Sequence, residues 1–193
     1  KKMFVAEKAP EAWLDKAFMH IVLGAVIGAR LGHVFFYDWE FYSNNLLEIP
    51  KIWRGGLASH GGAIGIIFAL WLFSKNVSKK SILWILDKVV VPTALAGCFI
   101  RLGNLMNSEI IGSPTEVSWA FIFTRIDSIP RHPVQLYESL TYLLSFVLLF
   151  GLYWKSNAKE KPGFFFGLFL ILIFGFRILM ENFKESQGGF ESA

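Results

Sequence analysis

The sequence has little charge and a single cysteine. Charged residues make up 18% of its 193 positions, whereas soluble domains carry about 25%. This deficit indicates that much of the chain is surrounded by lipid. The lone Cys98 excludes an internal disulfide and a cysteine-based metal cluster. Because Cys98 lies in an apolar run, we interpret it as a small core residue, with a nucleophile as the alternative.

Apolar and aromatic side chains are abundant, at 54% and 17% of the sequence. A membrane-spanning helix needs about 20 mostly apolar residues, and five stretches meet that requirement. They are too long for barrel strands, which alternate over about 10 residues. The sequence therefore predicts an all-α polytopic membrane bundle forming one integral membrane domain, residues 1–193. Its spans are expected at about 17–37, 56–73, 82–105, 135–154 and 163–181.

The lysines are concentrated in alternate loops. They precede the first span and fill the segments 75–80 and 155–161, whereas the segments 38–54 and 106–134 are richer in acidic and aromatic residues. Lysine in short loops marks the cytoplasmic side, so we expect residues 106–134 to form an outer cap. The net charge of +4 is then explained by topology and anionic lipid head groups. A nucleic-acid partner is not expected.

Three arginines lie near the outer ends of predicted spans: Arg30 in GARLGH, Arg101 in FIRLGN, and Arg177. Placing a charge at the centre of a membrane helix costs at least about 2.5–3.5 kcal/mol, which favours a functional or ion-pairing role for Arg30. Glu181 stands four residues after Arg177, so the two share a helix face and could pair. Arginine is suited to bidentate contact with phosphate.

Two further stretches hold unusually many polar side chains for the ends of membrane helices. One follows Arg101 and contains Asn104, Asn107 and Glu109; it predicts a cavity or a head-group site, with an interfacial cap as the alternative. The other, RHPVQLYES, holds His132, Gln135, Tyr137 and Glu138. Glu138 has a second interpretation, because a carboxylate near a helix N-terminus is favoured by the helix dipole.

The stretch WRGGLASHGGAIG places His60 among glycines at the start of the second span. Gly61 and Gly65 stand four residues apart, and Gly24, Gly28 and Gly32 repeat this spacing in the first span. Small residues so spaced let two membrane helices approach closely. That packing does not explain Gly55, Gly56 and Gly62, so we expect room for a lipid head group that His60 faces.

These residues together predict an anion-binding pocket with imidazoles beside it, at the depth of phospholipid phosphates. Neither the HExxH spacing of a metal site nor the GxSxG setting of a serine hydrolase is present, and no metal is expected. The residues alone indicate a membrane enzyme or a transporter that handles a phosphorylated lipid. A transporter would have broken helices in paired halves, for which the repeated RLG is the only hint.

Four motifs, in order, extend this interpretation: WRGGLASHGGAIG, GCFIRLGNLMNSEIIG, RHPVQLYE and FRILMENFK. They resemble the successive signatures of bacterial prolipoprotein diacylglyceryl transferases. The resemblance implies transfer of the diacylglyceryl group from phosphatidylglycerol to the lipobox cysteine thiol of a preprolipoprotein, with formation of a thioether and release of glycerol phosphate. It also implies an active site on the outer side of the bacterial inner membrane, among membrane lipids and without a cofactor. An anionic phospholipid flippase is the alternative.

The resemblance also implies roles for individual residues. Arg101 and Arg177 are expected to bind the phosphate, and His60 to act as the general base, with His132 as the second candidate. The remaining substrate-binding candidates are Arg30, Gly61, Gly62, Asn104, Glu109, Gly112, Gln135, Tyr137, Glu138 and Glu181. Where the family has a second late arginine, this chain has Lys184, which keeps the charge but lacks the planar fork. The family has seven spans, so one span is expected beyond each end of this sequence.

Overall fold

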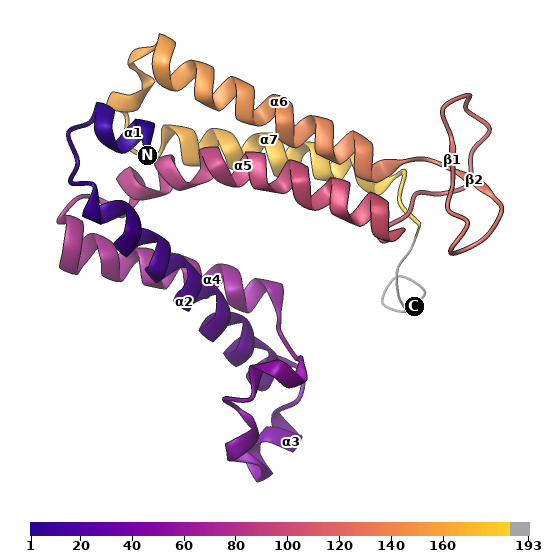
Figure 1. Ribbon diagram of the computed structural model, residues 1–193, viewed down its shortest axis with the longest axis horizontal. Helices are drawn as coiled ribbons and strands as arrows, with labels where there is room; N and C mark the ends of the chain where they lie inside the picture. Colours follow the sequence, from indigo (N-terminus) through magenta and orange to yellow (C-terminus); the bar gives the residue numbers. More distant parts are fainter. Residues whose placement is uncertain (186–193) are drawn as a thin grey trace. The chain divides into compact units, whose positions relative to one another are not determined.

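The computed structural model describes residues 1–185 (Figure 1). Its described residues divide into two compact units, 1–85 and 86–185. Within the described residues, five helices are long and apolar enough to cross a membrane, which confirms the predicted polytopic helical architecture. They are α2 (Ala12–Phe36), α4 (Ser59–Phe73) with its continuation to Ser78, α5 (Ile82–Asn107), α6 (Val134–Lys155) and α7 (Phe164–Glu181).

The first unit is built on the helix pair α2 and α4. Its shorter elements are α1 (Lys2–Ala6), α3 (Trp39–Asn44), the 3₁₀ turns η1 (Leu46–Glu48) and η2 (Ile52–Arg54), and the π-helical turn η3 (Ser74–Ser78). The second predicted span begins three residues later than expected. Gly55 and Gly56 have φ of +83° and +71°, and Ala58 is extended. Helix α4 therefore begins only at Ser59.

Glycines let α2 and α4 approach so closely that their backbones touch. A Cβ atom added at Gly28 would lie 2.7 Å from the Cα of Gly65, and one added at Gly32 would lie 2.7 Å from the Cα of Gly61. No real side chain tolerates such distances. The prediction that these small residues serve helix packing is confirmed, and the packing places His60 next to the Gly32–Gly61 contact.

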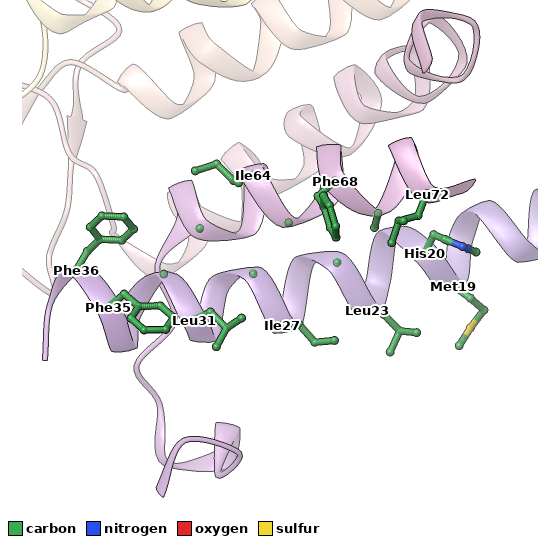
Figure 2. Close-up of a pocket in the computed structure, with 16 residues that line it drawn as sticks. Met19, His20, Leu23, Ile27, Leu31, Phe35, Phe36, Ile64, Phe68 and Leu72 are labelled. Carbon is green, nitrogen blue, oxygen red and sulfur yellow. The ribbon is translucent and has the colours of Figure 1, made fainter. Parts of the chain in front are cut away.

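An apolar groove of about 640 Å³ runs along the α2–α4 pair (Figure 2). Its floor is formed by the glycines at the crossing, and its walls by aliphatic and aromatic side chains of both helices, including Leu23, Ile27 and Phe68. A groove of this composition suits hydrocarbon, as expected for helices surrounded by lipid.

The second unit contains α5 from Leu86 onward, a small hairpin, and the antiparallel neighbours α6 and α7. The hairpin strands β1 (Phe121–Ile122) and β2 (Pro130–Arg131) pair with Phe121 opposite Arg131. The 3₁₀ turn η4 (Asn157–Glu160) precedes α7. The hairpin was not predicted, because two-residue strands leave no periodic signal. Phe123, which follows β1, forms a buried apolar cluster with Leu105 and Ile111, and Leu136 packs against this cluster.

Candidate functional site

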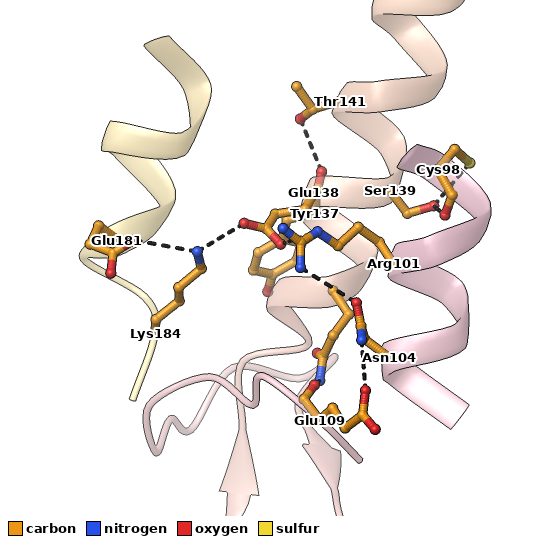
Figure 3. A network of polar contacts seen from close by, with 11 residues as sticks. Cys98, Arg101, Asn104, Glu109, Tyr137, Glu138, Ser139, Thr141, Glu181 and Lys184 are labelled. Carbon is orange, nitrogen blue, oxygen red and sulfur yellow. Dashed lines mark hydrogen bonds and ion pairs between the residues drawn. The ribbon is translucent and has the colours of Figure 1, made fainter. Parts of the chain in front are cut away.

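Glu138 lies at the centre of a polar network in the second unit (Figure 3). It projects from the first turns of α6 and is only 4% exposed. Arg101 Nε, from α5, lies 2.9 Å from Glu138 Oε2, and Lys184 Nζ, just after α7, lies 3.0 Å from Oε1. The Oε2 atom accepts no well-directed hydrogen bond from the described residues, so its contact with Arg101 is an ion pair. One buried carboxylate thus holds two cations.

The network continues from Arg101 toward the segment after α5. Asn104, one turn further along the helix, accepts a hydrogen bond from Arg101 through Oδ1 at 3.4 Å and donates to Glu109 Oε2 at 2.7 Å. Gln135 is fully buried and donates through Nε2 to the Glu109 carbonyl at 2.7 Å. Glu138 lies one turn after Gln135 on α6. The structure therefore brings together five predicted site residues: Arg101, Asn104, Glu109, Gln135 and Glu138.

Lys184 reaches Glu138 because the chain after α7 runs antiparallel to residues 111–113. Gly112 forms a β-bridge with Lys184, the Ser113 amide donates to the Phe183 carbonyl at 2.9 Å, and the Glu185 amide donates to the Ile111 carbonyl at 3.2 Å. A side chain at Gly112 would collide with His132. Gly112 therefore has a packing role here, and its substrate contact stays a prediction.

His132 belongs to a short hydrogen-bonded chain on the outer loop. Its Nδ1 lies 3.3 Å from the hydroxyl of Tyr137, and that hydroxyl accepts a hydrogen bond from Trp119 Nε1 at 2.8 Å. Since the Tyr137 oxygen already accepts from Trp119, its proton is available for His132 Nδ1. The ring of Phe183 packs edge-on against His132 at 5.2 Å. Sequence reasoning missed Trp119, whose only signal was a tryptophan within the polar outer loop.

A second residue to which sequence reasoning assigned no role is Arg131, the first residue of the RHPVQLYE motif. Its buried guanidinium donates to Asp127 Oδ2 at 2.6 Å, to Glu185 Oε2 at 2.8 Å and to the Gly112 carbonyl at 3.2 Å. The neighbouring Arg131 holds the pKa of the Asp127 carboxyl below its usual range. Arg131 thus connects the hairpin to the segment that carries Lys184, and helps to hold Lys184 in contact with Glu138.

Arg177 approaches the network from α7. Together with Arg101 and Glu138 it lines a small cavity between α5, α6 and α7. The predicted intrahelical pair with Glu181 is not among the contacts of the described residues. Glu181 instead contacts Lys184 Nζ at 3.3 Å, because the chain turns at the end of α7 and brings the lysine back to it. The second unit thus gathers two arginines and a lysine around Glu138.

In the first unit, Arg30 is buried beneath the loop that connects α3 to α4. Its guanidinium donates to the carbonyl oxygens of Ile49 at 2.6 Å, Glu48 at 2.7 Å, Gly55 at 2.6 Å and Gly56 at 3.2 Å, and it lies over the ring of Tyr42. Backbone carbonyls thus offset the cost of burying the Arg30 guanidinium. The sequence had suggested an ion pair or a phosphate as its partner. Substrate binding by Arg30 stays a prediction, with a structural role now shown beside it.

His60 is the second residue of α4 and is exposed. Its ring lies 5.5 Å from that of Tyr37 and 6.1 Å from that of Phe36. Gly61 packs on Gly32, while Gly62 faces α2 at ordinary contact distance. The predicted meeting of His60 with the arginines involves both units and stays a prediction. Among the described residues, no group of three His, Cys, Asp or Glu side chains could hold a metal.

Comparisons with known proteins show the family to which the sequence is similar. The family model described as prolipoprotein diacylglyceryl transferase matches residues 1–192. A phosphatidylglycerol–prolipoprotein diacylglyceryl transferase of Tolumonas auensis is 49% identical over 192 residues, covering all of this chain and 74% of its own length. The proteins of the same name from Chloroherpeton thalassium and Porphyromonas gingivalis are 49% and 46% identical. These alignments cover 98% and 99% of this chain and 70% and 71% of the relatives.

Proposed function

This chain belongs to the prolipoprotein diacylglyceryl transferase family, and we propose that it transfers the diacylglyceryl group of phosphatidylglycerol to the lipobox cysteine of preprolipoproteins. The observation that carries the proposal is the pair Arg101 and Arg177 bordering one cavity beside the buried Glu138. Two guanidinium groups at one cavity suit a phosphate, which prefers planar, bidentate donors.

The reaction that fits this site is a displacement at carbon 3 of the diacylated glycerol. The cysteine sulfur forms a bond to that carbon, and the bond from the carbon to the phosphate oxygen breaks. Glycerol phosphate leaves with the electron pair, and the thiol proton passes to a base. Arg101 and Arg177 stabilise the negative charge that develops on the leaving oxygen, which is where fixed positive charge accelerates such a step.

Glu138 and Asn104 keep the phosphate-binding arginine in place before the lipid arrives. Glu138 contacts Arg101 from α6, and Asn104 contacts it from one turn further along α5. The Oε1 atom of Gln135 is buried without a donor among the described residues. Buried polar atoms are rarely left without a partner, so Gln135 is suited to receive a hydroxyl of a polar head group.

A thiol has a pKa near 8.5 and reacts as the thiolate, so a base completes the site. His60 is our first candidate, because it lies exposed at the start of α4. His132 is the second, and its Nδ1 is already engaged by Tyr137. In this proposal the reaction takes place on the outer side of the bacterial inner membrane, without a metal or organic cofactor.

Incubating the purified protein with phosphatidylglycerol vesicles and a synthetic lipobox peptide tests the proposal. Mass spectrometry should detect a gain of one diacylglyceryl unit on the peptide cysteine, together with released glycerol phosphate. A peptide whose cysteine is replaced by serine is the control. Redistribution of lipid between leaflets without a peptide adduct would establish the flippase alternative and reject transfer.

The two histidines are separated by measuring His60→Ala and His132→Ala in the same assay. If His60 is the base, His60→Ala should lower kcat by about 10²–10⁴-fold, the usual contribution of general acid–base catalysis. His132→Ala should have a smaller effect. Full activity of His60→Ala would remove His60 from the mechanism, and a reversed order would assign the base to His132.

A further inference from the structure

Asp87 is a buried carboxylate near the beginning of α5, and the proposed reaction does not use it. It is 5% exposed, and both of its oxygens accept hydrogen bonds from the first turn of α7. Oδ2 accepts from the Gly163 amide at 2.7 Å, and Oδ1 accepts from the Phe166 amide at 2.8 Å. An acidic side chain of one spanning helix therefore caps the beginning of another.

Helix α7 depends on this outside help. Its N-cap residue is Gly163, which has no side chain and adopts φ of +90°. The first amides of a helix have no partner within it, and a buried amide without a partner is unfavourable. A carboxylate at this end is also favoured by the helix dipole. Capping by itself is a structural role. Because the cap joins α5 to α7, it also affects where α7 lies along α5.

The cap fixes how far α7 extends relative to α5. Fourteen residues separate Asp87 from Arg101 on α5, and fourteen also separate Gly163 from Arg177 on α7. At about 1.5 Å per residue, each arginine lies about 21 Å beyond the shared cap. Arg101 and Arg177 indeed line the same cavity, so the two helices run in the same direction over this length. We infer that Asp87 is a positioning residue that sets the register of α7 and thereby holds Arg177 at the depth of Arg101.

A small slip of α7 would disrupt this alignment. Sliding by one residue moves Arg177 by about 1.5 Å along the helix and rotates it by about 100°. Misplacement by about 1 Å can cost about 10²-fold in rate. Asp87 thus acts on the reaction through Arg177, without touching the substrate. The inference rests on the proposed role of Arg101 and Arg177 in binding the phosphate.

Its test measures helix register and activity on the same protein. Spin labels are placed at Met106 on α5 and Ile171 on α7, both exposed, in a Cys98→Ala background. This diagonal pair makes the distance between labels sensitive to sliding. With Asp87→Ala in lipid vesicles, electron spin resonance should show a broader distance distribution whose mean shifts by about 1.5–5 Å, between one residue and one helical turn. In the transfer assay kcat should fall about 10–100-fold.

Two further variants separate register from simple loss of stability. Asp87→Asn keeps one carbonyl acceptor, so it should restore part of the distance and part of kcat, and it serves if Asp87→Ala does not fold. Ser156→Ala is the matched control. It removes the hydroxyl that caps η4 by accepting from the Ala158 amide, on the same connection but away from Asp87. It should lower the melting temperature and leave both the distance and kcat unchanged.

Either of two results would overturn the inference. An unchanged distance in both Asp87 variants would show that the cap does not set register, whatever happens to activity. A shifted distance with unchanged kcat would show that register does not act through the arginines. Failure of the proposed function is recognised separately, because the unsubstituted protein would then leave the peptide unmodified while the distance measurement still reports on the cap.

Discussion

The tripeptide Arg-Leu-Gly occurs once in each unit, and its two arginines have different surroundings. Arg30 directs its guanidinium at four backbone carbonyls of one loop. Arg101 instead faces the carboxylate of Glu138 and a small cavity. A carbonyl of a folded loop is a permanent partner, whereas a carboxylate can share its cation with an incoming phosphate. The same tripeptide therefore supplies an arginine that stabilises a loop in the first unit and a candidate phosphate-binding arginine in the second.

The glycines of the two tripeptides differ in the same way. A Cβ atom at Gly32 would lie 2.7 Å from the backbone of Gly61, while a Cβ atom at Gly103 would meet nothing within 4 Å. Gly32 is needed for the close approach of α2 and α4. Gly103 is exposed on α5, and a side chain there would meet no neighbour within 4 Å.

The largest expected effect concerns the two arginines. Arg101→Ala should lower kcat for diacylglyceryl transfer by about 10³-fold, because it removes charge from the developing leaving group. Arg101→Lys should recover only part of this loss, since the planar fork is gone. Arg30→Ala should mainly reduce the amount of folded protein. Kinetics normalised to the amount of folded protein compare the two arginines. An equal loss of kcat in Arg30→Ala and Arg101→Ala would contradict the assignment of a structural role to Arg30.

The glycine comparison is tested by the same substitution at both positions. Gly32→Ala should destabilise the protein by about 1–3 kcal/mol, the usual cost of overpacking. Gly103→Ala adds a methyl group to open space within a helix and should be neutral or stabilising by up to about 1 kcal/mol. Denaturation in mild detergent measures both. Equal losses at the two positions would contradict the difference in packing.

A smaller effect is expected at Lys184, which shares Glu138 with Arg101. Lys184→Ala should lower kcat about tenfold, because Glu138 then draws Arg101 more strongly away from the phosphate. Such a change corresponds to about 1.4 kcal/mol in the barrier. Lys184→Arg restores a cation with five donors and should match the unsubstituted protein. A loss as large with arginine as with alanine would show that shape, and not charge, matters at this position.

The smallest effect is a pH dependence of the hairpin. Because Arg131 lowers the pKa of Asp127 in the folded protein, the ion pair contributes its full stability above about pH 4, near the ordinary pKa of an aspartate. That contribution is lost as the pH falls through the lowered folded value. The fluorescence of Trp119, taken as the difference between the protein and its Trp119→Phe variant, should therefore stay constant from pH 7 to about 4 and change below it. Asp127→Asn should abolish this step, and a step that persisted would belong to another group.

Much of this architecture could be predicted from residues close together in the chain. Hydropathy located the five spans with every end within five residues of the observed helix. The spacing of Gly24, Gly28 and Gly32 predicted close helix packing, which the structure confirms. Motif spacing also grouped Arg101 with Asn104 and Gln135 with Glu138. These features depend on helical periodicity, which neighbours in sequence are sufficient to define.

The choice of partner for each charge was decided by tertiary structure. Lys184 pairs with Glu138 on α6, 46 residues earlier in the chain, which no local spacing could have indicated. Arg30 found loop carbonyls, and Asp87 found the amides of a helix 76 residues further along the chain. The sequence by itself determined which segments enter the membrane and which side chains carry charge. Only the fold decided which distant backbone and side-chain groups offset each buried charge, because that depends on segments far apart in the chain.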